Sequence, residues 1–143
     1  MTDIDIRADA VRDTVRRLED AWAKNDADGV AEVYTEDTSL ILTRNDTYLK
    51  GREAIRSYFA AAYGGPMKDT RVVGTPLDIK RVSDDVVVMT TNGGVLYPGQ
   101  TAVSAENAIR ATWVFVRQGQ DWLISAYHNS PTVHAEPVTG EER

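Results

Sequence analysis

Cysteine is absent from the 143 residues, and histidine occurs only at His128 and His134. Without cysteine the chain has no disulfide, no thiolate nucleophile and no iron–sulfur or zinc–thiolate site. Two histidines are too few for a multi-histidine metal site within one chain. A dinucleotide-binding fingerprint is missing too, because the glycines of residues 93–99 do not have the G-x-G-x-x-G spacing after a strand. We therefore expect a protein that uses neither a metal nor a cofactor.

A long apolar run is also lacking, and residues 1–7 are charged. This pattern predicts neither a signal peptide nor a membrane span, so a cytoplasmic protein is expected. The 16 basic and 22 acidic residues give a net charge of −6 and are interspersed along the chain. Such a distribution favours neither nucleic acid nor an anionic membrane as a partner.

The apolar residues that are present recur first with a helical period. A stripe at i, i+4, i+7 and i+11 predicts a first helix, and Asp26 is placed to cap a short second helix that extends through Tyr34. A third helix follows Gly51 and ends at the Gly-Gly-Pro of residues 64–66. The stripes consist of Val11, Val15, Leu18 and Trp22 in the first helix and of Ile55, Tyr58, Phe59 and Ala62 in the third.

From residue 70 onward, β-rich segments replace the helical pattern, and they are joined by short turns that predict two hairpins. Helices followed by a curved antiparallel sheet define an α+β fold, in which the sheet wraps around about three N-terminal helices. We expect one domain over residues 1–143, with residues 131–143 as a loose tail. The predicted strands are residues 38–43, 71–82, 85–97, 107–117 and 121–130.

The predicted strand at residues 107–117 is apolar on both faces. Because helices cover one face of such a sheet, a second copy of the protein is the simplest cover for the other. The sequence therefore predicts a homodimer that packs through the sheet face. Trp113 has the opposite parity to Arg110 and is expected in that interface.

Three motifs in this order resemble the nuclear transport factor 2-like superfamily: W-x-x-N-D-A-D-G-V-A-x-x-Y-x-E-D at residues 22–37, G-R-E-A-I at 51–55 and W-x-I-x-x-x-H-N-S at 122–130. The resemblance implies a cone-shaped α+β fold whose sheet and helices enclose a pocket. Within the superfamily, R-A-T-W-V-F-V-R at residues 110–117 together with the last motif is similar to the SgcJ/EcaC group of SnoaL-like proteins. That resemblance implies a dimeric cytoplasmic protein of enediyne polyketide antibiotic biosynthesis, with a pocket for a hydrophobic small molecule.

The ketosteroid isomerase-like members of the superfamily offer a test for catalysis. They place a tyrosine on the first helix and a base aspartate on the strand after the second helix. Aligned through residues 25–26 and 36–37, those positions fall at Leu18 and Leu42, which are both apolar. An isomerase of that type is therefore disfavoured, and any acid–base chemistry has to come from other residues.

His128 is the only histidine within a predicted element, and histidine titrates near neutral pH. If the even-numbered residues of the last strand face inward, Trp122, Ile124 and Ser130 line the pocket together with His128. His128 is then a candidate general acid or base. The alternative is a histidine that is hydrogen-bonded at the sheet edge or in the dimer interface.

Arg110 shares a strand face with Thr112 and is expected across the hairpin from the polar end of the last strand. Inside the pocket its guanidinium would orient a carboxylate or enolate oxygen, and Asn92 would donate to a substrate oxygen. The alternatives are a surface or interface ion pair for Arg110 and a bulge or turn at Asn92.

Aromatic side chains on the helical stripes belong to the core, and in a cone fold helix residues that face the sheet also form the pocket wall. The predicted catalytic residues are therefore His128 and Arg110, and the predicted substrate-binding residues are Trp22, Tyr34, Tyr58, Asn92, Thr112, Ile124 and Ser130.

Two functions remain open on these residues. One is a cofactor-free enzyme that carries out proton transfer, cyclisation or hydration on a hydrophobic polyene-derived intermediate, with His128 as acid or base. The other is a non-catalytic dimeric protein that binds this intermediate or presents it to a later enzyme.

Overall fold

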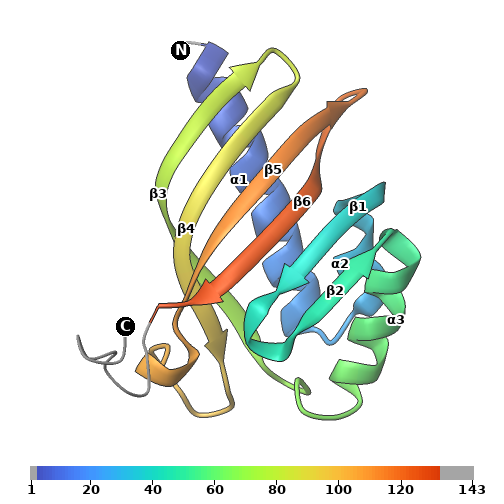
Figure 1. Cartoon of the computed structure of the whole chain (residues 1–143), viewed down its shortest axis with the longest axis vertical. Coiled ribbons are helices and arrows are strands. Elements are labelled where there is room, and N and C mark those ends of the chain that lie inside the picture. Colours follow the sequence, from blue (N-terminus) through green and yellow to red (C-terminus); the bar gives the residue numbers. More distant parts are fainter. Residues whose placement is uncertain (1–2, 133–143) are drawn as a thin grey trace, which may run out of the picture.

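The computed structural model describes residues 3–132, and it contains three α-helices on one side of a curved six-stranded sheet (Figure 1). The helices are α1 (Asp3–Ala23), α2 (Ala27–Glu32) and α3 (Arg52–Tyr63). The strands are β1 (Tyr34–Leu42), β2 (Thr47–Lys50), β3 (Arg71–Ser83), β4 (Val86–Leu96), β5 (Ile109–Gln118) and β6 (Asp121–Pro131). The predicted α+β class is confirmed. Among the described helices, none is both long and apolar enough to cross a membrane.

Local sequence signals begin the short helices where they were expected. The Asp26 carboxylate accepts a hydrogen bond from the Gly29 backbone N–H at 3.0 Å and caps α2. Gly51 precedes α3 with a φ of +92°, which favours glycine, and its N–H donates to the Thr38 carbonyl at 2.7 Å. Tyr34, however, is the first residue of β1 and not part of α2, because the Val33 carbonyl accepts a hydrogen bond from an N–H of β6.

The strand order in the sheet is β2-β1-β6-β5-β4-β3. The two predicted hairpins, β3–β4 and β5–β6, are confirmed. The sequence did not predict that β1 pairs in parallel with β6, nor that residues 47–50 form a strand against β1. The predicted loose tail began at residue 131, but Pro131 still belongs to β6, and residues 133–143 lie outside the described part.

Strand β6 reverses its facing at Ser125. Val114 of β5 pairs with Ala126, and the next residue of β5, Phe115, pairs with Ile124, so Ser125 is a bulge without a partner on β5. Ile124 is fully buried on the inner face of the sheet, which faces the helices, together with Trp122. Beyond the bulge the odd-numbered residues face inward, and His128 is exposed. The prediction that the even-numbered residues of β6 share one face is therefore wrong, because one extra residue shifts a period of two.

Two buried threonines hold the backbone of β6 just before the bulge. The Thr14 hydroxyl of α1 donates to the Trp122 carbonyl at 2.6 Å. The Thr38 hydroxyl of β1 donates to the Ile124 carbonyl at 3.0 Å. Both threonines are about as inaccessible as the apolar core around them. These hydrogen bonds connect α1 and β1 to the place where β6 changes face.

Replacing Thr38 with valine should lower the free energy of unfolding by about 1–3 kcal/mol, because a buried carbonyl loses its donor at nearly constant side-chain volume. Thr14→Val should have an effect of similar size. Urea denaturation followed by circular dichroism measures both. Thr75→Val, at an exposed position of β3, is the control and should change stability by less than about 0.5 kcal/mol. Equal effects at all three positions would show that these two hydroxyls contribute nothing specific.

Candidate functional site

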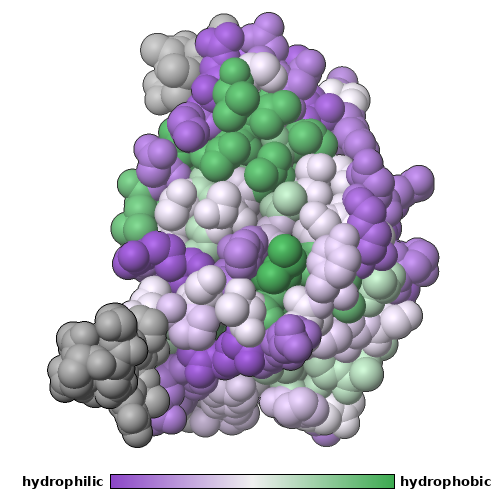
Figure 2. Space-filling view, viewed as in Figure 1, coloured by the Kyte–Doolittle hydropathy of each residue, from purple (hydrophilic) through white to green (hydrophobic). Residues whose placement is uncertain are grey.

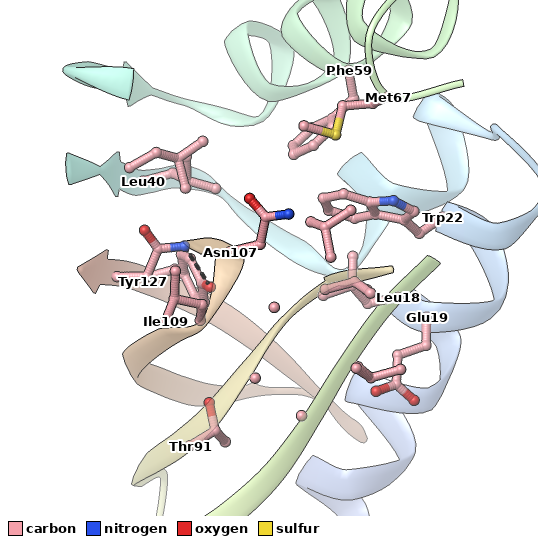
Figure 3. A pocket seen from close by; sticks show the side chains of 18 of the residues that line it. Leu18, Glu19, Trp22, Leu40, Phe59, Met67, Thr91, Asn107, Ile109 and Tyr127 are labelled. Atoms are coloured by element: carbon pink, nitrogen blue, oxygen red, sulfur yellow. Dashed lines mark hydrogen bonds between the residues drawn. The ribbon is translucent and has the colours of Figure 1, made fainter. Parts of the chain in front are cut away.

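A cavity of about 170 Å³ lies between the helices and the inner face of the sheet (Figure 3). Its apolar lining comes from elements far apart in the sequence. Leu18 and Trp22 project from α1, and Phe59 projects from α3. Met67 projects from the turn after α3, and the sheet contributes further apolar side chains, namely Leu40, Leu42, Val72, Val73, Val95, Ile109 and Trp113.

Aromatic rings form two opposite walls of this cavity. On the helical side, Trp22 lies edge-on to Phe59 with a centroid distance of 5.1 Å. On the sheet side, Trp113 lies edge-on to Tyr127 at 4.7 Å. Both indole N–H groups are already used, since Trp22 donates to Thr70 at 2.8 Å and Trp113 donates to Thr91 at 2.9 Å. The indoles are thereby fixed in orientation and present carbon surface to the cavity.

The sheet wall also carries phenolic hydroxyls. The Asn129 amide donates to the Tyr127 hydroxyl oxygen at 2.9 Å (Figure 3). Burial raises the pKa of Tyr127 to about 12, although the hydrogen bond from Asn129 acts to lower it. Burial, reinforced by the neighbouring Tyr127 and Tyr63, also raises the pKa of Tyr34 well above its ordinary value. The phenols of Tyr34 and Tyr127 therefore keep their protons at neutral pH and can act as hydrogen-bond donors.

Polar side chains surround the cavity at the ends of the strands. Arg44 and Asn45 come from the 3₁₀ turn η1 (Thr43–Asn45), and Asn107 ends a second such turn, η2 (Ala105–Asn107). The Asn107 side chain points into the cavity in Figure 3. Gly94 allows this loop to approach β4, because a Cβ there would lie 2.7 Å from the Asn107 carbonyl oxygen.

Glu19 is the one carboxyl among the lining residues that the structure describes. Burial raises its pKa, Asp20 raises it further, and Arg16 opposes them. From the sequence, Glu19 was expected on the polar face of the first helix. It stands four residues after Val15 and three before Trp22, however, and so belongs to the edge of the apolar stripe. Within residues 3–132, no group of three acidic or histidine side chains is arranged to hold a metal ion.

The raised pKa of Glu19 predicts a pH-dependent stability. Between the ordinary pKa of glutamate and the raised value, the folded state binds more protons than the unfolded state, so the free energy of unfolding falls as pH rises through this window. Glu19→Gln removes that loss. The melting temperature of the variant minus that of wild type should therefore be larger near pH 7 than near about pH 3.5. Thermal denaturation at both pH values measures it, with the exposed Glu32→Gln as control. A pH-independent difference for Glu19→Gln would contradict the prediction.

The structure brings together only the aromatic residues of the predicted site. Trp22, Tyr34 and Tyr58 line the cavity. Ile124 is fully buried on the inner face but does not line it. The other predicted residues lie on the outer face of the sheet, which faces away from the helices; they are Asn92, Arg110, Thr112, His128 and Ser130.

Arg110 and Thr112 lie across the hairpin from the polar end of β6, as predicted, but on the outer face of the sheet and not in the cavity. Arg110 pairs with Ser130 in register, and Thr112 pairs with His128. The Arg110 guanidinium donates to the Asn92 side-chain oxygen at 2.9 Å. His128 Nε2 lies 3.0 Å from the Thr43 hydroxyl. None of these side chains reaches the cavity, so the predicted pocket placement of His128 and Arg110 is corrected.

The same shift of face explains why Tyr127 and Asn129 were not predicted at the cavity. Trp113 was expected in a dimer interface, but it is buried on the inner face and lines the cavity. Tyr127 lies directly opposite it in the β5–β6 register, and Asn129 follows two residues later. An aromatic pair at matching hairpin positions was a usable signal for a shared face. Arg44 and Asn107 lie in turns, where no periodic pattern could have revealed them.

Leu18 and Leu42 both line the cavity. These are the positions at which the alignment placed the catalytic tyrosine and aspartate of ketosteroid isomerase-like proteins. Their presence at the cavity agrees with that alignment, and their apolar side chains supply neither a proton donor nor a base. The cavity therefore differs chemically from an isomerase site at both positions.

A helical layer that closes the concave side of a curved sheet around a cavity defines the nuclear transport factor 2-like, or cystatin-like, class of fold. A domain of unknown function from Nostoc punctiforme has a similar, cystatin-like fold. The match covers 90% of this chain and 78% of that protein, with a TM-score of 0.79 and 26% identity. An NTF-2 like protein of unknown function from Shewanella oneidensis has a TM-score of 0.72 and 18% identity over 86% of this chain and 98% of its own. An NTF2-like protein from Novosphingobium aromaticivorans has a TM-score of 0.74 and 20% identity over 87% of this chain and 81% of its own.

The chain belongs to the SnoaL-like domain family, whose model matches residues 11–134. The match includes every element that lines the cavity. No curated protein sequence matches this chain.

Proposed function

We propose that this SnoaL-like protein binds a largely apolar, conjugated small molecule in the cavity between the helices and the sheet. The observation that carries the proposal is the pair of aromatic walls, with Trp22 and Phe59 on one side and Trp113 and Tyr127 on the other. Rings fixed on opposite sides of a cavity suit a flat, unsaturated ligand, which can pack against both.

The polar groups inside the cavity are better suited to binding a ligand by hydrogen bonds than to transferring a proton. The Tyr34 and Tyr127 hydroxyls are protonated donors at neutral pH, which suits a carbonyl or hydroxyl oxygen on the ligand. His128, on which the catalytic hypothesis depended, lies on the outer face. Glu19 is the remaining candidate acid or base for an enzyme, because it lines the cavity and its pKa is raised.

The resemblance to the SgcJ/EcaC group supports a more specific ligand. It rests on the motifs at residues 110–117 and 122–130. On this basis we propose a polyene-derived intermediate of enediyne polyketide antibiotic biosynthesis, which the protein holds or presents to a later enzyme in the cytoplasm. A conjugated polyene is flat and apolar, and two aromatic walls provide the surfaces that such a chain would contact.

We also propose that two copies pack through the outer face of the sheet. Val88 of β4 and Val114 of β5 are directly paired there, and Val86 and Val116 form the next pair. These side chains are half-buried in the single chain, and apolar surface gathers over this part of the sheet in Figure 2. Apolar cross-strand pairs on a face without covering helices favour association with a second sheet.

Binding is tested with the neutral fluorescent probe N-phenyl-1-naphthylamine. The wild-type protein should enhance its emission in a saturable manner with one probe per chain. Leu42→Trp should weaken binding by about tenfold or more, because the larger side chain occupies cavity volume. Thr112→Ala, at an exposed position on the outer face, is the control and should bind like wild type.

Mass spectrometry of the recovered ligand separates binding from catalysis. With a conjugated polyene as ligand, the molecule should return chemically unchanged after prolonged incubation with the purified protein. Conversion that depends on Glu19 would replace the binding proposal with an enzyme. Loss of probe binding in Thr112→Ala, with retention in Leu42→Trp, would place the site elsewhere.

The dimer is tested by light scattering after size-exclusion chromatography. Wild type should have twice the 15.8 kDa mass of one chain, and Val114→Glu should convert it to a monomer, because a carboxylate would be buried between the sheets. Ala60→Glu adds the same charge on the exposed surface of α3 and should leave the dimer intact. A monomeric wild type at micromolar concentration would contradict the proposal.

A further inference from the structure

We propose that the ligand carries a carboxylate, which Arg44 binds at the rim of the cavity. This inference rests on the proposed binding function and adds the chemical class of the ligand, a hydrophobic acid. The inference is based on Arg44, which is the one basic residue among the described side chains that line the cavity, and on the groups around it.

The backbone around Arg44 is held in place on both sides. The Thr43 hydroxyl lies 3.0 Å from His128 Nε2, which connects the turn to β6. Asp46 adopts a left-handed conformation and its N–H donates to the Thr43 carbonyl at 3.1 Å. The Thr47 hydroxyl donates to the carbonyl of the residue after Arg44 at 3.2 Å. A rigid attachment of this kind lowers the entropic cost of using the guanidinium as a binding group.

Arg44 has no carboxylate partner in the described part of the chain. The ion pairs there involve Arg7, Arg12, Arg16, Arg52, Arg56, Arg81 and Arg117. Most arginines of this protein are thus engaged by acidic side chains, as expected for a chain with a net charge of −6. An arginine that lines an apolar cavity without such a partner leaves its fork of N–H donors available for a ligand carboxylate.

The other polar side chains at the cavity fit the same orientation. Asn45 follows Arg44 in the turn, and its amide nitrogen lies 3.5 Å from the Tyr58 hydroxyl. Asn107 and Asn129 add amide groups to the lining. Glu19 lies on the α1 side of the cavity, away from Tyr127 in Figure 3. A ligand acid would be repelled by Glu19 and attracted by Arg44, so the charges define one direction of binding.

The test uses two nearly isosteric competitors, 2-naphthoate and its neutral methyl ketone analogue 2-acetylnaphthalene, which displace N-phenyl-1-naphthylamine from the cavity. Wild type should bind naphthoate at least as tightly as the ketone, although the net negative charge of the protein opposes the anion. Arg44→Gln should weaken naphthoate by about tenfold and leave the ketone within about twofold. Arg17→Gln is the matched control, because Arg17 is exposed on α1 and also forms no ion pair within residues 3–132.

The outcomes separate the two proposals. If the neutral probe and the ketone bind but Arg44→Gln changes both competitors equally or neither, the carboxylate inference is wrong and the cavity still binds apolar ligands. If Arg17→Gln weakens naphthoate as much as Arg44→Gln does, general charge and not the rim arginine is responsible, which also overturns it. If neither the probe nor the ketone binds to wild type, the proposed function itself fails.

Discussion

The bulge at Ser125 determines the chemistry on both faces of this sheet. Strand β6 lies between β1 and β5, and it pairs with both of them. With an uninterrupted period of two, a strand that buries Trp122 and Ile124 would next direct His128 and Ser130 into the cavity. The extra residue exchanges them for Tyr127 and Asn129. One unpaired residue therefore replaces a titratable imidazole by an aromatic wall with a neutral donor.

The bulge is maintained by groups that come from outside β6. Thr14 and Thr38 satisfy the carbonyls of Trp122 and Ile124, and both hydroxyls are buried. Because an unsatisfied buried carbonyl is costly, these contacts favour one register of β6 over its neighbours. Helix α1 thus does more than cover the sheet: it supplies Leu18, Glu19 and Trp22 to the cavity and stabilises the strand that completes the opposite wall.

The parts of the fold that depend on local pattern were predictable. The apolar stripe of α1 and the glycine-containing loop of the β5–β6 hairpin are signals within a few residues, and both gave correct elements. The parallel pairing of β1 with β6 was not predictable in the same way, because it joins Tyr34 to Ile124 across most of the chain. The bulge also has no sequence signature, since serine is an ordinary residue at Ser125.

The same distinction divides the site. Trp22 and Tyr58 were placed at the cavity correctly because a helix keeps its facing over its whole length. The strand residues were misplaced because a facing inferred from Trp122 was carried through the bulge to His128. Arg44 and Asn107 lie in 3₁₀ turns, whose direction depends on packing against other elements. The sequence thus predicted part of the aromatic lining of the cavity, and it did not predict Trp113, Tyr127 or most of the polar lining.

The polar half constrains what the cavity can do. A general base works best when its pKa lies near the ambient pH, and the Tyr127 phenol, with a pKa of about 12, is far from that condition. As a donor, however, a neutral phenol next to an amide holds a ligand oxygen without removing a proton from it. Leu18 and Leu42, which the alignment places at the acid and base positions of ketosteroid isomerase-like proteins, line the cavity and continue its apolar wall. Under the proposed function, the aromatic walls contact the ligand and the neutral donors orient it, an arrangement that suits retention of the ligand better than its conversion.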